Sequence, residues 1–560
     1  MTFNKVVFDI ETTMTADKIW CIVCKHGDTY YQFKEDRLHR FAELIKQTDE
    51  VIGHNIIGFD IPVVNTIFGY DVFANCKVTD TLVLSRLLNP MIEGGHSLKN
   101  WGTKLGQNKI HFEQFDFFSE DMLTYCRNDV ELTERLYKFL INKTKDFGQS
   151  VELEHKVAQI IQKQHERGFK INVVEAYELQ SKFQEDMNNL TSKVRETFPP
   201  LKIEEEFIPK SNNKARGYVK GVPFTKVKYK EFNLGSRQQI AERLVMLGWK
   251  PKKKTDKGHI IVDEKVLSEI HNIPEAKLIN RYLMLQKRIA QVNSWIEAIK
   301  EDGRVHGKVI TNGTITGRMS HQSPNMAQIP AVYSPYGKEC RALWTVNKGY
   351  KLVGVDASGL ELRMLAHYMN DKDYIYEVVN GDIHTANQNA AGLESRDKAK
   401  TFIYAFIYGA GSKKIGSIIG GSERDGERTK EKFLRATPSL RSLREKVERV
   451  AQRRWVRGLD QRKIIIRHPH AALNTLLQGA GAIVMKYALT LLEQYVINKQ
   501  IKAFPVVNVH DEFQYEVEES RAEEFGRLAV QSIIDAGKQL NVRCPLNGEY
   551  KIGNNWSETH

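Results

Sequence analysis

The sequence predicts an α/β protein of several domains. Its 560 residues are too many for one ordinary hydrophobic core, so three or four domains are expected. Short apolar runs that end on acidic residues, such as 5–11 and 350–356, are typical of strands in a sheet. Residues 151–198 instead show helical periodicity with high charge, interrupted by a turn around Gly168. Strands and long helices in a chain of this length indicate the multidomain α/β class.

The overall charge favours a polyanionic partner. The chain carries a formal charge of +13, which by itself fits nucleic acid and an anionic membrane surface equally well. No apolar run approaches the ~18–20 residues that span a bilayer, and the N-terminus lacks a signal-peptide pattern. We therefore expect no membrane association and a cytoplasmic location. Six scattered cysteines, with a lone CxxC at Cys21 and Cys24, favour buried thiols over zinc or redox use.

Carboxylates recur in three segments of residues 1–150. Asp9 and Glu11 are two apart at a strand end, so both face one side of the strand, where like charges repel unless a cation lies between them. Asp60 follows among apolar residues. Tyr125 and Asp129 are four apart, so both can reach one site from a helix. Four carboxylates and one phenol suit phosphodiester hydrolysis with two metal ions ~3.5–4 Å apart.

The stretch 395–411 carries an unusual helix face. Arg396, Lys400, Tyr404 and Tyr408 are spaced four apart, which aligns them on one side of a helix. The cations suit a triphosphate, and a ring behind them can stack on a sugar or base. The alternative is a solvated basic stripe that continues as a core-facing aromatic stripe. No P-loop is present in the sequence, as is expected if a helix and two metal ions hold the nucleotide.

Two further acidic motifs flank this stretch. Asp356 ends an apolar strand, and Ser358 is predicted to cap a helix that begins with the following apolar run. Asp511 lies in a short acidic turn between two alternating runs, 504–509 and 513–517, which predict a hairpin. Oxygen ligands together with phosphates favour Mg²⁺ or Mn²⁺ over zinc.

Three segments are candidates for contact with DNA. The turn-rich segment 313–330 offers Arg318, Asn325 and Gln328 as donors to the minor-groove edge, where every base pair presents acceptors. A small-residue helix over 471–486 carries Asn474 and Gln478 on one face. The third is 199–232, which is rich in lysine and aromatic residues and lacks periodicity. It fits either a solvated surface loop or contact with the duplex backbone.

These motifs, in this order, resemble those of the family A DNA polymerases. The sequences of the segments are most similar to the phage replicative (T-seven-like) type, which has a DEDDy 3′→5′ exonuclease domain. The resemblance implies an RNase H-like α/β exonuclease domain (1–150) followed by a right-hand polymerase domain. Its parts would be the thumb (151–297), the first part of the palm (298–368), the fingers (369–473) and the second part of the palm (474–560). The implied activity is primer extension with dNTPs and 3′→5′ proofreading, in phage genome replication.

The resemblance also implies a role for each site residue. In the exonuclease, Tyr125 would orient the attacking water, and the metal ligands would be Asp9, Glu11, Asp60 and Asp129. In the polymerase, the metal ligands would be Asp356, the carbonyl of Ala357, and Asp511. Each site would hold two Mg²⁺ ions, for which Mn²⁺ can substitute.

The implied nucleotide-binding residues are Glu361, His384, Arg396, Lys400, Tyr404 and Tyr408. Among them, Glu361 would exclude a ribose 2′-OH, Lys400 would protonate the pyrophosphate, Tyr404 would face the sugar, and Tyr408 with Gly409 would border the templating base. The implied DNA-binding residues are Arg318, Gln328, Asn474, Gln478 and His510, and His510 and Glu512 would also support the catalytic aspartates.

Several partner expectations follow from the resemblance. Primer–template DNA and dNTPs are the expected substrates, and a helicase or a single-strand-binding protein is a candidate replisome partner. The related phage polymerases carry a long thumb insertion that captures thioredoxin. This chain holds only a short version, so a thioredoxin clamp is not expected. A flap-nuclease domain before the exonuclease domain is not expected, nor is 5′-nuclease activity. The protein is expected to be a monomer.

Two alternatives remain at this point. A single-subunit RNA polymerase shares the palm chemistry but is disfavoured by the proofreading segments and by Glu361. An exonuclease whose C-terminal half only clamps DNA is disfavoured because both palm aspartates and both fingers cations are present.

Overall fold

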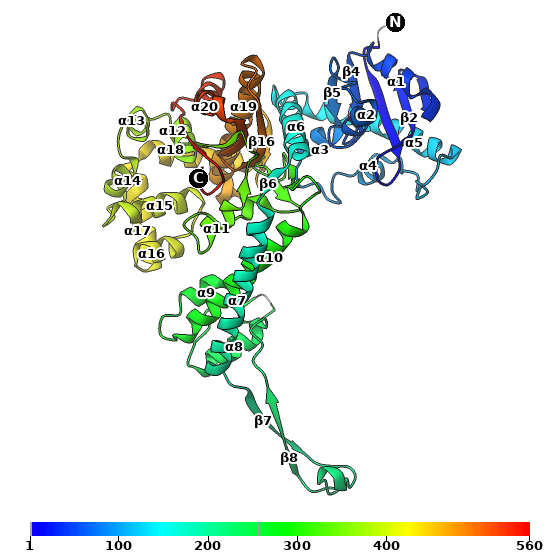
Figure 1. The fold of residues 1–560 in the computed structure, drawn as a ribbon. Coiled ribbons are helices and arrows are strands. Elements are labelled where there is room, and N and C mark those ends of the chain that lie inside the picture. Colours follow the sequence, from blue (N-terminus) through cyan, green and yellow to red (C-terminus); the bar gives the residue numbers. More distant parts are fainter. Residues whose placement is uncertain (1–2, 256) are drawn as a thin grey trace. The chain divides into compact units, whose positions relative to one another are not determined.

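The structure is a computed structural model that describes residues 3–255 and 257–560. It divides into two compact units (Figure 1), the first made of the chain up to Lys170 together with His306–His560, and the second of Ile171–Val305. Both sheets and long helices are present, as the multidomain α/β prediction requires.

The N-terminal part of the first unit is built on a mixed five-stranded sheet of order β3-β2-β1-β4-β5. β1 pairs antiparallel with β2 and parallel with β4, β2 pairs antiparallel with β3, and β4 pairs parallel with β5. The strands are β1 (Val6–Thr12), β2 (Ile19–His26), β3 (Thr29–Lys34), β4 (Glu50–Gly53) and β5 (Lys77–Asp80). This sheet agrees with the predicted RNase H-like fold.

Helices cover both faces of this sheet because alternate strand residues are apolar on both sides. Phe8 packs with Phe41 of α1, whereas Val7 belongs to the core formed with Val130 of α5. The helices here are α1 (Leu38–Ile45), α2 (Asp60–Phe68), α3 (Thr81–Leu88), α4 (Leu98–Leu105) and α5 (Glu120–Thr144), with η1 (Glu35–Arg37) before α1. Cys21 and Cys24 are buried free thiols within this sheet, as predicted.

A second sheet organises the C-terminal part of the first unit. Its order is β16-β17-β13-β18 and all its pairs are antiparallel. The strands are β13 (Tyr350–Ala357), β16 (Ala503–Val509), β17 (Glu512–Glu518) and β18 (Gly548–Gly553). The predicted hairpin around Asp511 is confirmed. The predicted central strand is also confirmed, and it ends at Ala357, one residue after Asp356.

One large core joins this sheet to its helices. The helices are α6 (Ser150–Arg167), α12 (Leu360–Met369), α19 (Ala472–Asn498) and α20 (Ala522–Gln539), with η4 (Pro469–Ala471) and η5 (Glu519–Arg521). The segment 469–498 is long and apolar enough to span a membrane, but it is mostly buried inside the protein, so it is a core helix. The prediction that no apolar stretch reaches this length therefore holds only for strictly continuous apolar runs.

The predicted helix cap at Ser358 is wrong. Gly359, at φ 58°, is the residue that precedes α12, and no side chain caps this helix. The Ser358 amide donates to the Asn547 carbonyl, and its own carbonyl accepts from Arg363 Nε. The tight turn after β13 requires a positive φ that glycine adopts readily, and this displaces serine from the capping position.

Residues between Met369 and α19 form a helical subdomain. Its central helix α15 begins after the Ser395 cap, and Phe402 and Phe406 pack their rings on Phe433. The elements are α13 (Lys372–Val379), α14 (Ile383–Ala391), α15 (Arg396–Ile407), α16 (Ser412–Ile419), α17 (Glu423–Ala436), α18 (Pro438–Ala451), β14 (Trp455–Arg457) and β15 (Lys463–Ile465).

Short elements elsewhere are β6 (Phe169–Ile171), β9 (Arg304–Val305), β10 (Lys308–Ile310), β11 (Ser320–Gln322), η3 (Met326–Gln328), α11 (Gly337–Ala342) and β12 (Trp344–Thr345).

The second unit contains a hairpin that the sequence did not predict. Residues 199–232 were expected to be irregular, yet β7 and β8 pair antiparallel over seven residues each. Neither strand has a buried residue, so the hairpin lacks the one-sided apolar pattern that identifies strands in a sequence. The elements of this unit are α7 (Val173–Thr197), β7 (Leu201–Phe207), η2 (Lys214–Arg216), β8 (Phe224–Lys230), α8 (Arg237–Met246), α9 (Glu264–Ser268) and α10 (Glu275–Glu297).

A buried charge cluster connects distant segments of the first unit. Lys486 of α19 donates to both oxygens of Glu154 of α6 at 2.7 and 2.9 Å. Arg462 donates to Glu154 at 2.5 Å and to both oxygens of Asp460, and Lys486 also donates to Asn312 at 2.7 Å. Burial opposes ionisation of Glu154, but the two cations outweigh it and hold its pKa below the usual range. Two cations and two anions thus balance inside the core.

Removing one member of this cluster should destabilise the first unit strongly. We expect Glu154→Gln to lower its stability by about 3–5 kcal/mol, because it leaves buried cations uncompensated. Glu152→Gln is the matched control on the same helix, since the Glu152–Lys156 pair is exposed, and it should cost about 0–1 kcal/mol. The measurement is the midpoint of chemical denaturation, and equal shifts for the two variants would contradict the prediction.

Candidate active sites

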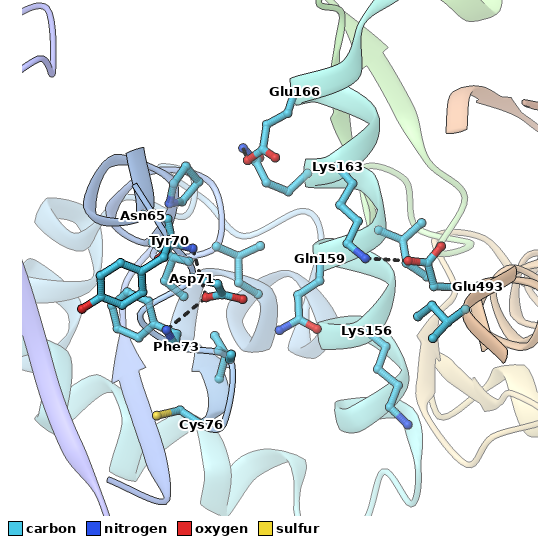
Figure 2. A pocket seen from close by; sticks show the side chains of 18 of the residues that line it. Asn65, Tyr70, Asp71, Phe73, Cys76, Lys156, Gln159, Lys163, Glu166 and Glu493 are labelled. Carbon is cyan, nitrogen blue, oxygen red and sulfur yellow. Dashed lines mark hydrogen bonds and ion pairs between the residues drawn. The ribbon is translucent and has the colours of Figure 1, made fainter. Parts of the chain in front are cut away.

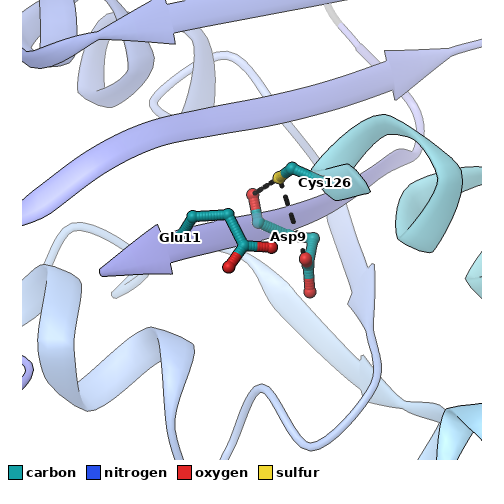
Figure 3. A group of neighbouring side chains, drawn as sticks. All are labelled: Asp9, Glu11 and Cys126. Atoms are coloured by element: carbon teal, nitrogen blue, oxygen red, sulfur yellow. Dashed lines mark hydrogen bonds between the residues drawn. The ribbon is translucent and has the colours of Figure 1, made fainter. Parts of the chain in front are cut away.

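The first carboxylate cluster forms beside the N-terminal sheet. Asp9 and Glu11 lie on β1, with Cys126 of α5 next to Asp9 (Figure 3). The Cys126 thiol donates to the Asp9 carbonyl at 3.4 Å. One ligand atom of each of these three residues lies within 4.8 Å of the others. Asp60, the first residue of α2, is 4% exposed, so it is as buried as a core residue.

Burial and neighbouring negative charges raise the pKa values of these carboxyl groups. Burial, with the charges of Asp60 and Glu11, raises the pKa of Asp9 well above its usual value. Burial raises the pKa of Glu11 to about 9 and that of Asp60 to about 7. The buried Oδ1 atom of Asp129 has no hydrogen-bond partner among the described residues. Buried carboxylates with an unpartnered oxygen fit a divalent cation, whose charge would allow all of them to ionise.

Lys109 is a member of this cluster that the sequence did not indicate. Its Nζ lies 2.5 Å from Asp129 Oδ2 and 4.7 Å from the centre of the Tyr125 ring. It comes from the loop between α4 and α5, and a single lysine in a polar loop carries no motif. Only the fold brings this cation to the carboxylates, where it neutralises part of their charge.

Tyr125 is held in place by aromatic neighbours. Its ring stacks on Phe112 at 5.3 Å and meets Phe115 edge-on at 6.3 Å. Burial raises the pKa of its hydroxyl to about 12. The phenol therefore stays protonated near neutral pH and is able to donate a hydrogen bond to a water molecule at the carboxylates.

The second carboxylate cluster lies at one end of the C-terminal sheet. Asp356 is on β13, opposite Glu512 on one side and Glu549 on the other. Asp511 occupies the turn after β16, and its carbonyl accepts from the Ala357 amide at 3.1 Å. Burial and the neighbouring carboxylates of Asp511 and Glu512 raise the pKa of Asp356 to about 7. The two aspartates therefore also fit a cation between them.

Glu512 lies opposite Asp356 on the neighbouring strand, and three side chains fix its position. Its Oε1 accepts from Gln514 and Trp556, both at 2.6 Å, and its Oε2 lies 3.0 Å from His560 Nδ1. Burial opposes its ionisation, but the bonds from His560, Gln514 and Trp556 outweigh it and hold the pKa of Glu512 below its usual value. Glu512 is therefore an ionised group that fixes the start of β17. The contributions of Trp556 and His560 were not predicted, because they lie more than 40 residues away in sequence.

Helix α15 presents the predicted cations at its N-terminal half. Arg396 is held by Asp382 at 2.7 Å, whereas Lys400 is exposed and has no ion pair among the described residues. His384 lies near Tyr404, with 6.3 Å between ring centres, and its Nδ1 is buried without a described partner. Tyr404 and Tyr408 follow with 6.5 Å between their rings. The predicted four-residue spacing on one helix face is confirmed, with Tyr408 just past the last helical residue.

Three predicted site residues bind one another. Tyr408 Oη donates to the two carboxylate oxygens of Glu361 at 2.7 and 2.8 Å, and Arg318 Nη2 donates to Glu361 Oε1 at 3.0 Å. From sequence, Glu361 was assigned to the sugar, Arg318 to DNA and Tyr408 to the templating base. Their common contact places the three side chains within one hydrogen-bonded group.

The remaining DNA-binding candidates lie on separate elements. Gln328 ends η3, and Asn474 and Gln478 are one turn apart near the start of α19. The Asn474 Oδ1 atom is buried and has no hydrogen-bond partner among the described residues. His510, exposed in the turn before Asp511, has a φ of 56°.

A separate cavity of about 860 Å³ lies between α2, α6 and α19. Figure 2 shows Lys163 of α6 paired with Glu493 of α19 on one side, and Asn65 and Phe73 bonded to Asp71 on the other. Among the residues that the structure describes, its lining includes none of the carboxylates of the two clusters.

Comparisons with known proteins identify the class of this fold. The POL domain of Pol1 from M. smegmatis, solved in complex with a DNA primer-template and dNTP, superposes with a TM-score of 0.82. The match covers 99% of this chain and 95% of that one at 18% identity, so it shows a shared fold. The chain therefore has the fold of that polymerase domain.

Sequence comparison gives the family. The family model for DNA polymerase family A matches residues 217–558. The DNA-directed DNA polymerase of Enterobacteria phage T3 is 33% identical over 99% of this chain and 100% of its own length, and that of Escherichia phage T7 is 35% identical over 87% and 88%. DNA polymerase I of Helicobacter pylori is 29% identical over 59% of this chain and 38% of its own. The chain belongs to DNA polymerase family A.

The position of Lys109 predicts how it affects metal binding. The ammonium group of Lys109 pairs with Asp129 and so competes with a metal ion for this carboxylate. Lys109→Met should therefore raise the affinity of the first cluster for Mn²⁺ roughly tenfold, or about 1.4 kcal/mol. Titration calorimetry in an Asp511→Ala background isolates this cluster from the second. Lys104→Met, an exposed lysine on α4, is the matched control. Weaker or unchanged Mn²⁺ binding by Lys109→Met would contradict the prediction.

Proposed function

We propose that this family A polymerase extends a primer on a DNA template with dNTPs at Asp356 and Asp511, and degrades DNA from the 3′ end at Asp9, Glu11, Asp60 and Asp129. The observation that carries the proposal is the presence of two crowded carboxylate clusters on two different sheets. One phosphoryl-transfer centre needs only one such cluster. Two clusters fit synthesis at one sheet and proofreading at the other.

The polymerase family uses divalent metal ions, and the residues present suit them. We assign two Mg²⁺ ions, replaceable by Mn²⁺, to each site. Asp356, Asp511 and the Ala357 carbonyl would hold one pair, and the four N-terminal carboxylates the other. Bound there, the ions supply the charge that activates a nucleophilic oxygen and stabilises the leaving oxygen. Hard oxygen ligands support Mg²⁺ and Mn²⁺ rather than zinc.

The residues of the polymerase site would contact different parts of the incoming nucleotide or its template base. Arg396, Lys400 and His384 would bind the triphosphate, and Lys400, the exposed cation, would protonate the leaving pyrophosphate. Tyr404 would face the sugar, and Tyr408 with Gly409 the templating base. Glu361 would exclude a ribose 2′-OH. The bonds from Tyr408 and Arg318 support this last role, because they fix the carboxylate of Glu361 in one orientation.

The residues of the exonuclease site would work on a water molecule. Tyr125 is a protonated phenol beside Asp129, so it would orient the water that attacks the terminal phosphodiester. Lys109 would neutralise Asp129 until the ions bind.

DNA contacts are proposed for Arg318, Gln328, Asn474, Gln478 and His510. Primer–template DNA and dNTPs, which the M. smegmatis structure contains, are the proposed substrates. The phage T3 and T7 relatives, both DNA-directed DNA polymerases, support a role in phage genome replication. The host cytoplasm is the proposed location, and a helicase or a single-strand-binding protein is a proposed partner. We retain thumb, palm and fingers over the ranges given from sequence, and we propose that the polymerase works without thioredoxin.

The two activities should be separable. Asp9→Ala combined with Glu11→Ala should reduce 3′→5′ digestion roughly 100-fold or more and leave extension intact, since residues that merely support metal ligands already contribute about 10- to 100-fold. Asp511→Ala should do the reverse. A labelled primer–template, with and without dNTPs, reports both reactions.

The same assay tests the alternatives. Loss of extension in a folded exonuclease double variant would refute the two-site assignment. Extension with NTPs in preference to dNTPs would indicate an RNA polymerase, and digestion without any extension would indicate a nuclease with a DNA clamp.

Tyr404 should determine how the enzyme treats dideoxynucleotides. Its hydroxyl can replace the hydrogen bond that a missing 3′-OH no longer makes near the triphosphate. Such a bond to a charged group is worth roughly 1.5–3 kcal/mol, or about 10- to 100-fold in relative incorporation. Tyr404→Phe should therefore raise the ratio of kcat/KM for deoxy- over dideoxynucleotide by that factor. A large wild-type ratio that Tyr404→Phe leaves unchanged would show that Tyr404 does not face the sugar.

A further inference from the structure

The β7–β8 hairpin of the second unit divides into a stem and a tip. The stem is the two paired strands, 201–207 and 224–230, and the tip is the loop 208–223 that joins them. The base of the stem is anchored in the core of this unit, where Phe198 and Phe232 are buried with 5.0 Å between their ring centres. Arg243 also donates to the Pro199 carbonyl at 2.8 Å. The hairpin thus starts from a fixed base.

The positive charges of the stem are already engaged. Lys228 pairs with Glu205 at 2.7 Å and Lys202 with Glu204 at 2.6 Å. Lys230 lies 3.4 Å from Glu242 of α8, and Lys226 lies over the Phe207 ring at 3.5 Å. The stem contains four lysines against three glutamates. The net charge of the stem is therefore small, although lysine is its most frequent residue.

The tip is different. It holds Lys210, Lys214, Arg216 and Lys220 and no acidic residue, and all four side chains are exposed. Within residues 3–255 and 257–560, none of these four cations has an ion pair. Four uncompensated charges within one short loop form the most strongly positive part of the hairpin and attract a polyanion.

The backbone of the tip is ordered, which fixes the positions of these charges. Asn213 and Tyr218 form a bridge around η2, the Lys220 amide donates to Asn212 Oδ1 at 2.7 Å, and the Gly221 amide donates to the Pro209 carbonyl at 2.9 Å. Tyr218 packs edge-on against Phe224 at 4.9 Å and tilted against Phe207 at 5.4 Å.

The same aromatic packing indicates which part of a nucleic acid fits. Because the three rings contact one another, they form a support beneath the tip rather than a platform on which unpaired bases can stack. Cations on flexible side chains instead match the regularly spaced phosphates of a duplex. Exposed Ile208, Val219 and Val222 beside them can contact the apolar faces of the sugars.

We propose that the tip, residues 208–223, is a duplex-DNA contact that binds the phosphate backbone through Lys210, Lys214, Arg216 and Lys220, while the lysines of the stem do not take part. This inference rests on the proposed polymerase function, whose DNA it would hold. A second contact on an already bound duplex acts at high effective concentration, so weak individual contacts lengthen the time that the enzyme stays on its template.

The test compares two variants that each lose four positive charges from the hairpin. The tip variant is Lys210→Ala, Lys214→Ala, Arg216→Ala and Lys220→Ala. The stem variant is Lys202→Ala, Lys226→Ala, Lys228→Ala and Lys230→Ala. Affinity for a fluorescent duplex primer–template is measured by anisotropy at several salt concentrations, without divalent ions or nucleotides. Binding is then scored independently of both catalytic reactions.

Each phosphate contact contributes about 0.9 to the slope of log K against log salt. The tip variant should therefore lose about 3–4 units of slope, and the stem variant less than about 1. A partial variant, Lys214→Ala with Arg216→Ala, should lose about 2 units of slope. Thermal melting shows whether each variant is folded, and the partial variant still tests the proposal if the full variant misfolds.

Three results would overturn the proposal. An unchanged slope in the tip variant would exclude DNA contact there and favour an acidic protein as the occupant. An equal loss in the stem variant would show that only net charge matters. A loss seen with single-stranded but not duplex DNA would assign the tip to unpaired template. Failure of primer extension, by contrast, would refute the proposed function without changing these slopes.

Discussion

The first unit depends on a buried set of four balanced charges. Glu154 and Lys486 are 332 positions apart in sequence, and Arg462 joins them from the turn between β14 and β15. Burying ions costs several kcal/mol each, so the arrangement is stable only when every partner is in place. It therefore specifies the packing of α6 on α19, the helix that also carries Asn474 and Gln478.

The two carboxylate clusters, unlike the Glu154 cluster, contain more negative than positive charge. Among the described residues, their charges are only partly balanced: Lys109 pairs with Asp129, His560 pairs with Glu512, and Arg318 pairs with Glu361. Burial, together with neighbouring negative charges, raises the pKa values of Asp9, Glu11, Asp60 and Asp356. Like charges therefore lie close together at positions where a bound cation would relieve their repulsion, whereas the charges of the Glu154 cluster are paired.

Sequence reasoning failed where local signals compete with the fold. Ser358 was a reasonable helix cap, but the turn after β13 required a positive φ and Gly359 occupies the position before α12. The β7–β8 hairpin has no buried face, so it produced no strand pattern. Lys109, Trp556 and His560 carry no motif at all, and only their positions in space identify them as members of the two clusters.

By itself, the sequence determined the α/β class, the strand-end and helix positions of the carboxylates in the two clusters, and the helix face from Arg396 to Tyr404. These follow from periodicities of two and about four residues, which are local properties of strands and helices. The tertiary structure decided which charges are compensated: Glu154 fully, Glu361 by Tyr408 and Arg318, and the hairpin stem but not its tip. Compensation depends on distances between segments that are far apart in the chain, and those distances exist only after folding.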